Sequence, residues 1–466
     1  MGTRNRSGRQ WVAALVCILV FGSVLVLTPA GAQVTVPDPR PNILIILTDD
    51  QRLEGTMAVL PHVDRWLAEG GRTFTDAFST TPLCCPSRTT ILTGRYAHNH
   101  GILDNAATNR SVLDQSTMLP RYLQDSGYRT AYFGKLFNFW RVEDDPAFFD
   151  RWAIVSPTRT SNGYVGGTWN VQGTLRMIDR YSTDYIASEG IRFIREAEAA
   201  DAQPWFLELA TYAPHLKAVP APSYVEAPVG RFHPTPAMTE VDRSDKPPFV
   251  RAEQVELRSV ATARERQLRA LKSVDDLVAR IAQVIRRTGE SRDTLVVFLS
   301  DNALLWGEHG LRSKGYPYGP GVRIPLLLRW PTDVEEATVD HRLVATVDVA
   351  PTIMDAAGIA PDPSVPMDGH SLLDPTWDRD LILLEFWPWT GSSAPRWASI
   401  WGATYQYTEY YADDGKTVFR EFYDLVGDPW QLTNLLHDGD PVNDPSISEL
   451  HERLMVYGTC AGTACP

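Results

Sequence analysis

The sequence predicts an α/β protein with a large, mostly parallel sheet and a small antiparallel C-terminal subdomain. Short apolar runs recur along the first two thirds of the chain, and stretches with helical periodicity lie between them. Alternating strands and helices are typical of a mostly parallel sheet covered by helices on both faces. The 466-residue chain is 44% hydrophobic and 22% charged, which agrees with a globular protein that buries a sizeable core.

The strands predicted for this sheet are unbroken apolar runs, as expected where both faces of a strand are buried. Two of the runs end in polar residues, Thr48-Asp49-Asp50 and Ser300-Asp301-Asn302. Ligands of such sheets bind beyond the carboxyl ends of the strands, so these residues are candidates for a site. The predicted strands cover residues 42–47, 129–133, 205–210, 294–299 and 324–328.

The clearest helix is predicted over residues 273–288, where apolar side chains recur on one face. Arg286 and Arg287 lie in its last turn and Gly289 follows as a stop. Residues 218–249 are rich in proline and polar residues without a clear period, so we expect a long surface loop there, a candidate lid over the site.

The pattern changes after Pro375 to short aromatic strands, which predicts a separate antiparallel subdomain that ends in a helix. Its strands are predicted at 381–386, 397–405 and 417–423, with Asp413-Asp414-Gly415 as a hairpin turn, and its helix at 447–457. We therefore expect a leader at 1–32, a catalytic domain at 40–375 and this subdomain at 376–466.

The leader carries three arginines, an uncharged run over 11–27 and an Ala-x-Ala end at 30–32, which is typical of a cleaved secretory signal. A retained membrane anchor is the alternative, because a run of this length is at the lower limit for a span. The net charge of −13 is a poor match for nucleic acid, and loss of the basic leader makes the chain more acidic still. We expect a secreted or extracytoplasmic protein with no nucleic-acid partner and no membrane contact after cleavage.

The cysteines pose two separate questions. Cys460 and Cys465 frame a short loop and could close as a disulfide in an oxidising compartment, with two free thiols as the alternative. Cys84 and Cys85 are adjacent and precede Pro86, a residue suited to the first turn of a helix, with Gly94 at its end. Cys84 is therefore expected just before a helix N-terminus, where free N–H groups favour an anion.

The string around Cys84, Cys-x-Pro-Ser-Arg-x-x-x-Leu-Thr-Gly-Arg over 84–95, resembles the signature of the sulfatase family at every fixed position. The resemblance implies an alkaline-phosphatase-like fold for the catalytic domain. It also implies that Cys84, rather than Cys85, is converted to Cα-formylglycine by a separate formylglycine-generating enzyme. The alternative is that Cys84 is an ordinary buried cysteine before a short helix, with no modification.

The two polar strand ends resemble the metal-binding pairs of the same family. The resemblance implies that one ion is held by Asp49, Asp50, Asp301, Asn302 and the modified Cys84. Carboxylate and amide oxygens suit Ca²⁺, with Mg²⁺ as the alternative, better than zinc. Taken alone, such residues at strand ends are more often turn or cap residues.

Four further positions match family residues that contact the sulfate or the modified residue: Arg88, Lys135, His215 and Lys314. The resemblance implies that Arg88 and the metal activate the attacking hydroxyl of the hydrated aldehyde. Lys135 and Lys314 would then hold the sulfate oxygens, and His215 would protonate the leaving oxygen. Taken singly, a lysine or a histidine after proline is usually a surface or loop residue.

One position departs from the usual family pattern, because Phe137 stands where many sulfatases have a histidine that serves as base in the second step. The segment Gly-Lys-Leu-Phe-Asn over 134–138 is instead similar to the corresponding segment of the N-acetylglucosamine-6-sulfatase branch. His98-Asn99-His100 also resembles that branch, and we expect it to order the turn after the signature helix rather than to bind a transition metal. His309 is left open between a supporting role and substrate contact.

The sequence therefore predicts hydrolysis of sulfate monoesters, with 6-O-sulfated N-acetylglucosamine in glycans as the expected substrate. The expected partners are thus a sulfated sugar or an aryl sulfate, and the converting enzyme during maturation. Three alternatives remain: an arylsulfatase of broad specificity, a phosphodiester or phosphonate monoester hydrolase, and a protein that only binds sulfated glycans.

Overall fold

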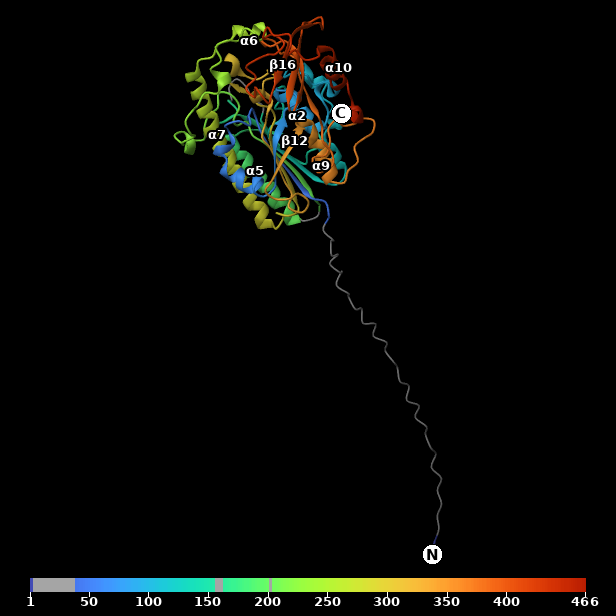
Figure 1. The fold of residues 1–466 in the computed structure, drawn as a ribbon. Coiled ribbons are helices and arrows are strands. Elements are labelled where there is room, and N and C mark those ends of the chain that lie inside the picture. The colour runs from blue at the N-terminus through green and yellow to red at the C-terminus, as the bar shows by residue number, and fades with distance from the viewer. Residues whose placement is uncertain (3–37, 156–161, 201–202) are drawn as a thin grey trace. The chain divides into compact units, whose positions relative to one another are not determined.

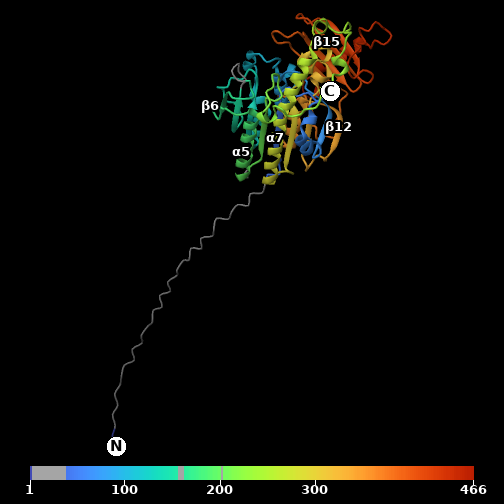
Figure 2. The ribbon, with the colours of Figure 1, turned by 90° about the vertical axis from the view of Figure 1, so that its left-hand side faces the viewer.

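A mixed sheet forms the centre of the protein in the computed structural model, which describes residues 1–2, 38–155, 162–200 and 203–466. Within these residues the strand order is β12-β2-β11-β8-β1-β7-β3-β4-β5-β6. Figure 2 shows the two edge strands, β6 and β12, at opposite sides of the sheet. The strands are β1 Asn42–Thr48, β2 Arg72–Phe78, β3 Arg129–Lys135, β4 Arg151–Val155, β5 Thr168–Val171, β6 Thr174–Met177, β7 Trp205–Ala210, β8 Thr294–Ser300, β11 Leu326–Arg329 and β12 Thr338–Ala345.

The middle of this sheet is parallel, as predicted, since β8, β1, β7, β3 and β4 run in one direction. The predicted strand at 324–328 is β11, and it pairs antiparallel with both β8 and β2. The outer strands β2, β4, β5, β6 and β12 were not predicted. They are half-exposed at several positions, so their sequences lack the unbroken apolar runs of the central strands.

Helices cover both faces of the sheet, which confirms the predicted fold class (Figure 1). Side chains of β1 alternate between the faces, so Leu44 and Ile46 join one apolar cluster and Ile43, Ile45 and Leu47 the other. The first cluster packs under α5 (Ser182–Ala200) and α7 (Leu257–Thr288), and the second under α2 (Cys84–Thr93), α4 (Leu119–Asp125) and α9 (Val349–Ala356).

Helix α7 begins sixteen residues before the predicted start at 273, at Leu257, and ends at Thr288 before Gly289 as expected. Six of the sixteen residues 257–272 are charged and three of the apolar ones are alanine, so the apolar face is weaker here than in the second half. The structure still buries Val260, Gln267 and Leu268 there, so tertiary packing extends the helix.

The proline-rich stretch at 218–249 is largely irregular, as predicted, and its ends are anchored. Tyr224 donates to Asp276 of α7 at 2.5 Å, and Arg243 donates to the carbonyl of His309 at 2.5 Å. The remaining short elements are α1 Pro61–Val63, α3 Ala97–His100, α6 Pro248–Ala252, α8 Gly319–Val322, β9 Leu305–Trp306 and β10 Arg312–Ser313.

The C-terminal residues form the predicted antiparallel sheet, with strand order β13-β14-β15-β16. One strand prediction here was wrong, because residues 397–405 belong to two strands, β14 and β15, joined by a turn at 403–404. The turn residues are Ala403 and Thr404, flanked by Trp401 and Tyr405, and they contain no Asn-Gly or Asp-Gly pair that would mark a hairpin. The elements are β13 Leu381–Phe386, β14 Arg396–Gly402, β15 Tyr405–Tyr411, β16 Thr417–Asp424 and α10 Ile447–Gly458.

The described residues between 38 and 466 form one compact unit. Most of the predicted leader, residues 3–32, lies outside the described part of the chain. None of the helices among the described residues combines the length and the apolar composition that crossing a membrane requires.

Candidate active site

Two neighbouring parallel strands bring the predicted metal-binding residues together. The register pairs Thr48 of β1 with Ser300 of β8, so the residues that follow each strand meet at one edge of the sheet. The backbone N–H of Asp50 donates to Asp301 Oδ1 at 3.2 Å, and Asn302 Nδ2 donates to Asp50 Oδ1 at 2.5 Å. Asp50 adopts φ 66°, a left-handed conformation that turns the chain directly after β1.

Helix α2 places Cys84 against these carboxylates. Leu83 is the N-cap residue, so Cys84 is the first helical residue rather than the residue before the helix, and Gly94 ends the helix with φ 65°. The Cys84 thiol donates to Asp49 Oδ1 at 3.6 Å, and Lys314 Nζ donates to Cys84 Sγ at 2.8 Å. Cys84 is fully buried between the first turn of α2 and the strand ends.

The three predicted cations pair with the three aspartates. Arg88 donates to Asp301 Oδ2 at 2.8 Å and to Asp49 Oδ2 at 3.2 Å. Lys135 contacts the same oxygen of Asp49, and Lys314 Nζ lies 2.5 Å from Asp50 Oδ1. Three carboxylates thus face three cations, and a cation added to this site would leave a positive balance for an anionic substrate.

The pKa shifts follow from this pairing. Burial alone would raise the pKa of Asp49 and Asp50, but the neighbouring cations, Lys135 first for Asp49 and Lys314 first for Asp50, outweigh it and lower both. Burial and the charge of Asp49 raise the pKa of the Cys84 thiol. An unmodified Cys84 therefore stays protonated, which makes it a poor thiolate nucleophile.

His215 and Lys314 are the accessible members of the cluster. The side chain of His215 is 22% exposed and that of Lys314 10%, whereas Asp50 is 1% exposed. His215 Nε2 lies 3.6 Å from Asp50 Oδ2, and its Nδ1 donates to the carbonyl of Leu216 at 3.2 Å. Burial lowers the pKa of His215 against the opposing effect of Asp50.

The residues fit the implied cation. Asp50 Oδ2 and Asn302 Oδ1 are buried and have no hydrogen-bond partner among the described residues. Two oxygens in that state are what a bound cation would satisfy. Ligand atoms of Asp49, Asp50, Cys84 and His215 also lie within 4.8 Å of one another. Asp301 and Asn302 join this group through their hydrogen bonds to Asp50.

Sequence reasoning missed three residues that support the cluster. The hydroxyl of Tyr132 donates to the carbonyl of Lys135 at 2.5 Å, behind Arg88. The ring of Tyr212 lies 5.3 Å from Lys135 Nζ and 4.7 Å from the ring of His215. Asn105 Oδ1 accepts from the backbone N–H of Cys85 at 2.9 Å. A buried strand tyrosine and loop residues carry no pattern that distinguishes them.

The residues of the other motif positions lie outside the charged cluster. Phe137 is buried and stacks on Phe139, with ring centroids 5.2 Å apart. His309, left open from the sequence, bonds Glu240 at 2.8 Å and packs on Tyr318 at 4.3 Å, and none of its contacts within the described residues reaches Cys84.

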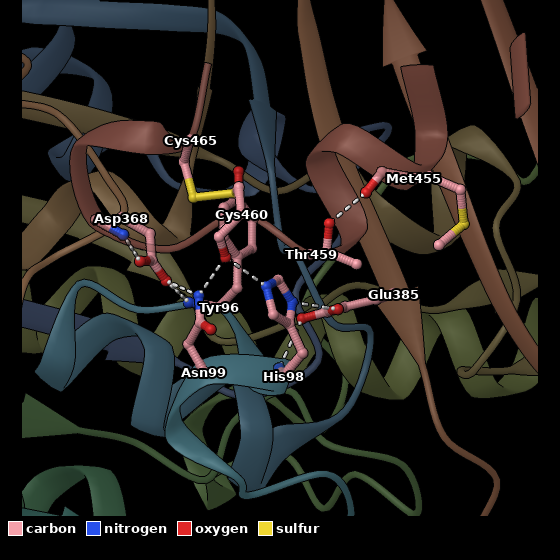
Figure 3. The surroundings of a disulfide bond; sticks show 10 residues. Tyr96, His98, Asn99, Asp368, Glu385, Met455, Thr459, Cys460 and Cys465 are labelled. Atoms are coloured by element: carbon pink, nitrogen blue, oxygen red, sulfur yellow. Dashed lines mark hydrogen bonds and ion pairs between the residues drawn. A yellow bond between two sulfur atoms is a disulfide. The ribbon is translucent and has the colours of Figure 1, made fainter. Parts of the chain in front are cut away.

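His98-Asn99-His100 lies in α3. His98 and Asn99 hold the chain that follows α2, as predicted (Figure 3). His98 Nδ1 lies 2.8 Å from Glu385 Oε2, while its Nε2 and Asn99 Nδ2 both donate to the carbonyl of Cys460. Cys460 and Cys465 form the disulfide that the sequence left open. The motif therefore binds the C-terminal disulfide loop to the segment that follows α2.

Known proteins are similar to this chain in sequence and in fold. The family model described as Sulfatase matches residues 41–359, and that described as N-sulphoglucosamine sulphohydrolase, C-terminal, matches residues 307–458. The extracellular sulfatase SULF-1 homolog of Drosophila melanogaster is 33% identical over 75% of this chain, and the match spans 32% of that protein's length.

Two further similarities extend over nearly the whole chain. Human N-acetylglucosamine-6-sulfatase is 28% identical over 96% of this chain and 88% of its own length, which confirms the resemblance to that branch. A structure solved in complex with its substrate D-glucosamine-2-N,6-O-disulfate superimposes with a TM-score of 0.78 at 22% identity, covering 89% of this chain and 97% of the other. The chain belongs to the sulfatase family.

Proposed function

We propose that this protein hydrolyses sulfate monoesters at Cys84, after conversion of that residue to formylglycine. The observation that carries the proposal is the buried cluster in which three aspartates and three cations surround Cys84 at the first turn of α2. With a cation bound, such a site would carry the positive balance that neutralises an anionic ester. The family membership supports the same reaction class.

The chain's own residues have distinct parts in the proposed reaction. Lys314 and His215 are the partly exposed members of the cluster; in this proposal Lys314 orients the sulfate and His215 donates a proton to the departing sugar oxygen. Arg88 and Lys135 are buried behind them and hold Asp49 in its ionised form. One hydroxyl of the hydrated aldehyde attacks sulfur and displaces the sugar oxygen. The second hydroxyl then loses its proton and re-forms the aldehyde C=O, which breaks the carbon bond to the sulfated oxygen and releases sulfate.

A calcium ion, with magnesium as the alternative, is the proposed cofactor. Asp49, Asp50, Asp301 and Asn302 would hold it through hard oxygen ligands, and the modified residue 84 would add another. The ion supplies positive charge that stabilises the developing negative charge of the transition state. Removal of the ion by a chelator should abolish sulfate release, and calcium should restore it; elemental analysis that finds stoichiometric zinc with neither calcium nor magnesium would contradict the assignment.

The proposed substrate is 6-O-sulfated N-acetylglucosamine, free or at the end of a glycan. The similarity to the human N-acetylglucosamine-6-sulfatase supports this assignment, as does the segment Gly-Lys-Leu-Phe-Asn over 134–138. Hydrolysis rates of 2-, 4- and 6-sulfated monosaccharides, an aryl sulfate and a phosphate diester, each followed through its own product, test it. Preference for the 6-sulfate supports the proposal, equal turnover of all sulfates indicates an arylsulfatase of broad specificity, and preference for the diester indicates the phosphodiester alternative.

We also propose that the protein is secreted after cleavage of the leader at 1–32. The leader composition and the extracellular sulfatase among the relatives support secretion, with conversion of Cys84 by a formylglycine-generating enzyme during maturation. N-terminal sequencing of the secreted protein should begin after residue 32. An N-terminus that retains the leader would instead favour a membrane anchor.

A further inference from the structure

A hollow of about 380 Å³ opens beside Cys84, a volume within the range of small-molecule sites. Two of its lining residues connect it to the reacting centre. Lys314 lines the hollow and its Nζ lies 2.8 Å from Cys84 Sγ, while Leu83 lines it and directly precedes Cys84. A sulfate held at Lys314 therefore has its attached group next to this hollow.

An aromatic residue of the C-terminal sheet forms one wall. Trp389 follows β13 and lines the hollow. Its ring meets the fully buried ring of Phe386 edge to face, with centroids 5.6 Å apart and planes at 88°. This contact fixes the indole, whose flat apolar surface suits the C–H face of a sugar ring.

Polar groups for hydroxyls lie on another wall, after α3. Asp104 Oδ1 accepts from the backbone N–H of Ala106 at 2.8 Å and from Asn109 Nδ2 at 2.7 Å, which holds the carboxylate in place. Within the described residues, Asp104 Oδ2 makes no hydrogen bond or ion pair. Asn105, also in the lining, is held through its Oδ1 by Cys85. A carboxylate oxygen and an amide N–H together match a hydroxyl, which both donates and accepts.

The hollow is lined by one cation, Lys314, and one carboxylate, Asp104, on different walls. Lys314 is already engaged with Asp50 and Cys84, on the side where the sulfate reacts. Asp104 is the remaining charged residue among those that line the hollow in the described structure. A second anionic group on the sugar would face this carboxylate rather than a cation. Two negative charges inside one small hollow repel, so this group would weaken binding.

We propose that this hollow binds the sugar ring of the substrate against Trp389, and that Asp104 selects a sugar whose only anion is the reacting sulfate. The inference rests on the proposed function and adds the site that holds the leaving group. It predicts that N-acetylglucosamine 6-sulfate is preferred over glucosamine that carries sulfate on both N2 and O6.

The test of selection is Asp104→Asn, which keeps an oxygen for Ala106 and Asn109 and removes the charge. Its kcat/KM for the disulfated sugar should rise on the order of tenfold relative to that for the monosulfated sugar. Asp114→Asn is the matched control, because Asp114 Oδ1 caps an exposed turn by accepting from the N–H of Ser116 at 2.9 Å. A ratio unchanged in Asp104→Asn, or changed equally in Asp114→Asn, would overturn the selection.

The test of the stacking wall is Trp389→Ala, checked for folding by its thermal unfolding. It should lower kcat/KM for N-acetylglucosamine 6-sulfate on the order of tenfold, mainly through KM. Ligand-observed NMR with N-acetylglucosamine gives a readout that needs no turnover: the wild-type protein should bind the sugar and Trp389→Ala should not. If no probe releases sulfate but this difference persists, the proposed reaction fails and the sugar site stands. Equal binding by both proteins overturns the site.

Discussion

Glu208 is a carboxyl group buried in the middle of the main sheet, and we predict that its replacement by glutamine changes how stability depends on pH. The register pairs Glu208 with Tyr132 and Ile45, so its side chain lies on the sheet face covered by α2. It is 1% exposed, and its Oε2 has no hydrogen-bond partner among the described residues. Burial raises its pKa from 4.5 to about 7, against the opposing charge of Arg88.

The magnitude follows from the two pKa values. The interval from 4.5 to about 7 corresponds to about 3 kcal/mol of unfolding free energy. Because the pKa is higher in the folded state, the folded protein retains a proton that the unfolded chain loses. The wild-type stability is therefore complete below the unfolded value, falls as the pH rises between the two values and is constant above the folded value.

Glu208→Gln removes this dependence. Urea unfolding of both proteins between about pH 4.5 and pH 8 should show the variant gaining about 3 kcal/mol relative to the wild type as the pH rises. Any packing cost of the amide displaces the difference by a constant and leaves its slope. A difference that does not vary with pH would refute the reasoning.

The variant Glu409→Gln tests the direction of the pH dependence of stability. Hydrogen bonds from Tyr407 and Arg420 outweigh burial and lower the pKa of Glu409. Its contribution to stability is therefore present above the unfolded pKa and lost as the pH falls through the folded pKa. Glu409→Gln should thus lose stability relative to the wild type as the pH rises, opposite to Glu208→Gln.

Three further predictions concern the site and its support. Cys84→Ala should abolish turnover while Cys85→Ala retains most of it, as measured by sulfate release; equal losses would show that the assigned nucleophile is wrong. His215→Ala should reduce kcat on a 6-sulfated sugar roughly 10²–10⁴-fold and far less on an aryl sulfate, whose phenolate leaves with little protonation; equal effects would remove the acid role. Burial alone would lower the pKa of His98, but Glu385 outweighs it and raises that pKa, so its stabilising contribution is complete below about pH 6.5 and lost as the pH rises through the folded value. Thermal unfolding of His98→Gln should therefore show its largest deficit in acid, and a deficit that grows with pH would contradict this.

The central fold was predictable because burial on both faces leaves a direct mark on sequence. The runs at 42–47, 205–210 and 294–299 coincide closely with β1, β7 and β8. The edge strands and the first half of α7 were not predictable, since their polar residues face solvent and their placement depends on neighbours distant in sequence.

The site was predictable to the extent that its residues belong to recognisable strings. Asp50 and Asn302 could be expected to meet, because they follow parallel strands, and the structure joins them by a hydrogen bond. Tyr132, Asp104 and Trp389 could not, because each lies in an unremarkable stretch and acquires its place through tertiary packing. The hollow beside Cys84 is made by four segments, before α2, after α3, around β10 and after β13, that no local pattern connects.

The mass of the tryptic peptide that contains Cys84 tests the central claim most directly. We predict that protein produced with the converting enzyme yields a peptide lighter than the unmodified one, with the loss located at residue 84 by fragmentation. Sulfate release should scale with the converted fraction. Full sulfatase activity in protein whose residue 84 is entirely unmodified cysteine would contradict it.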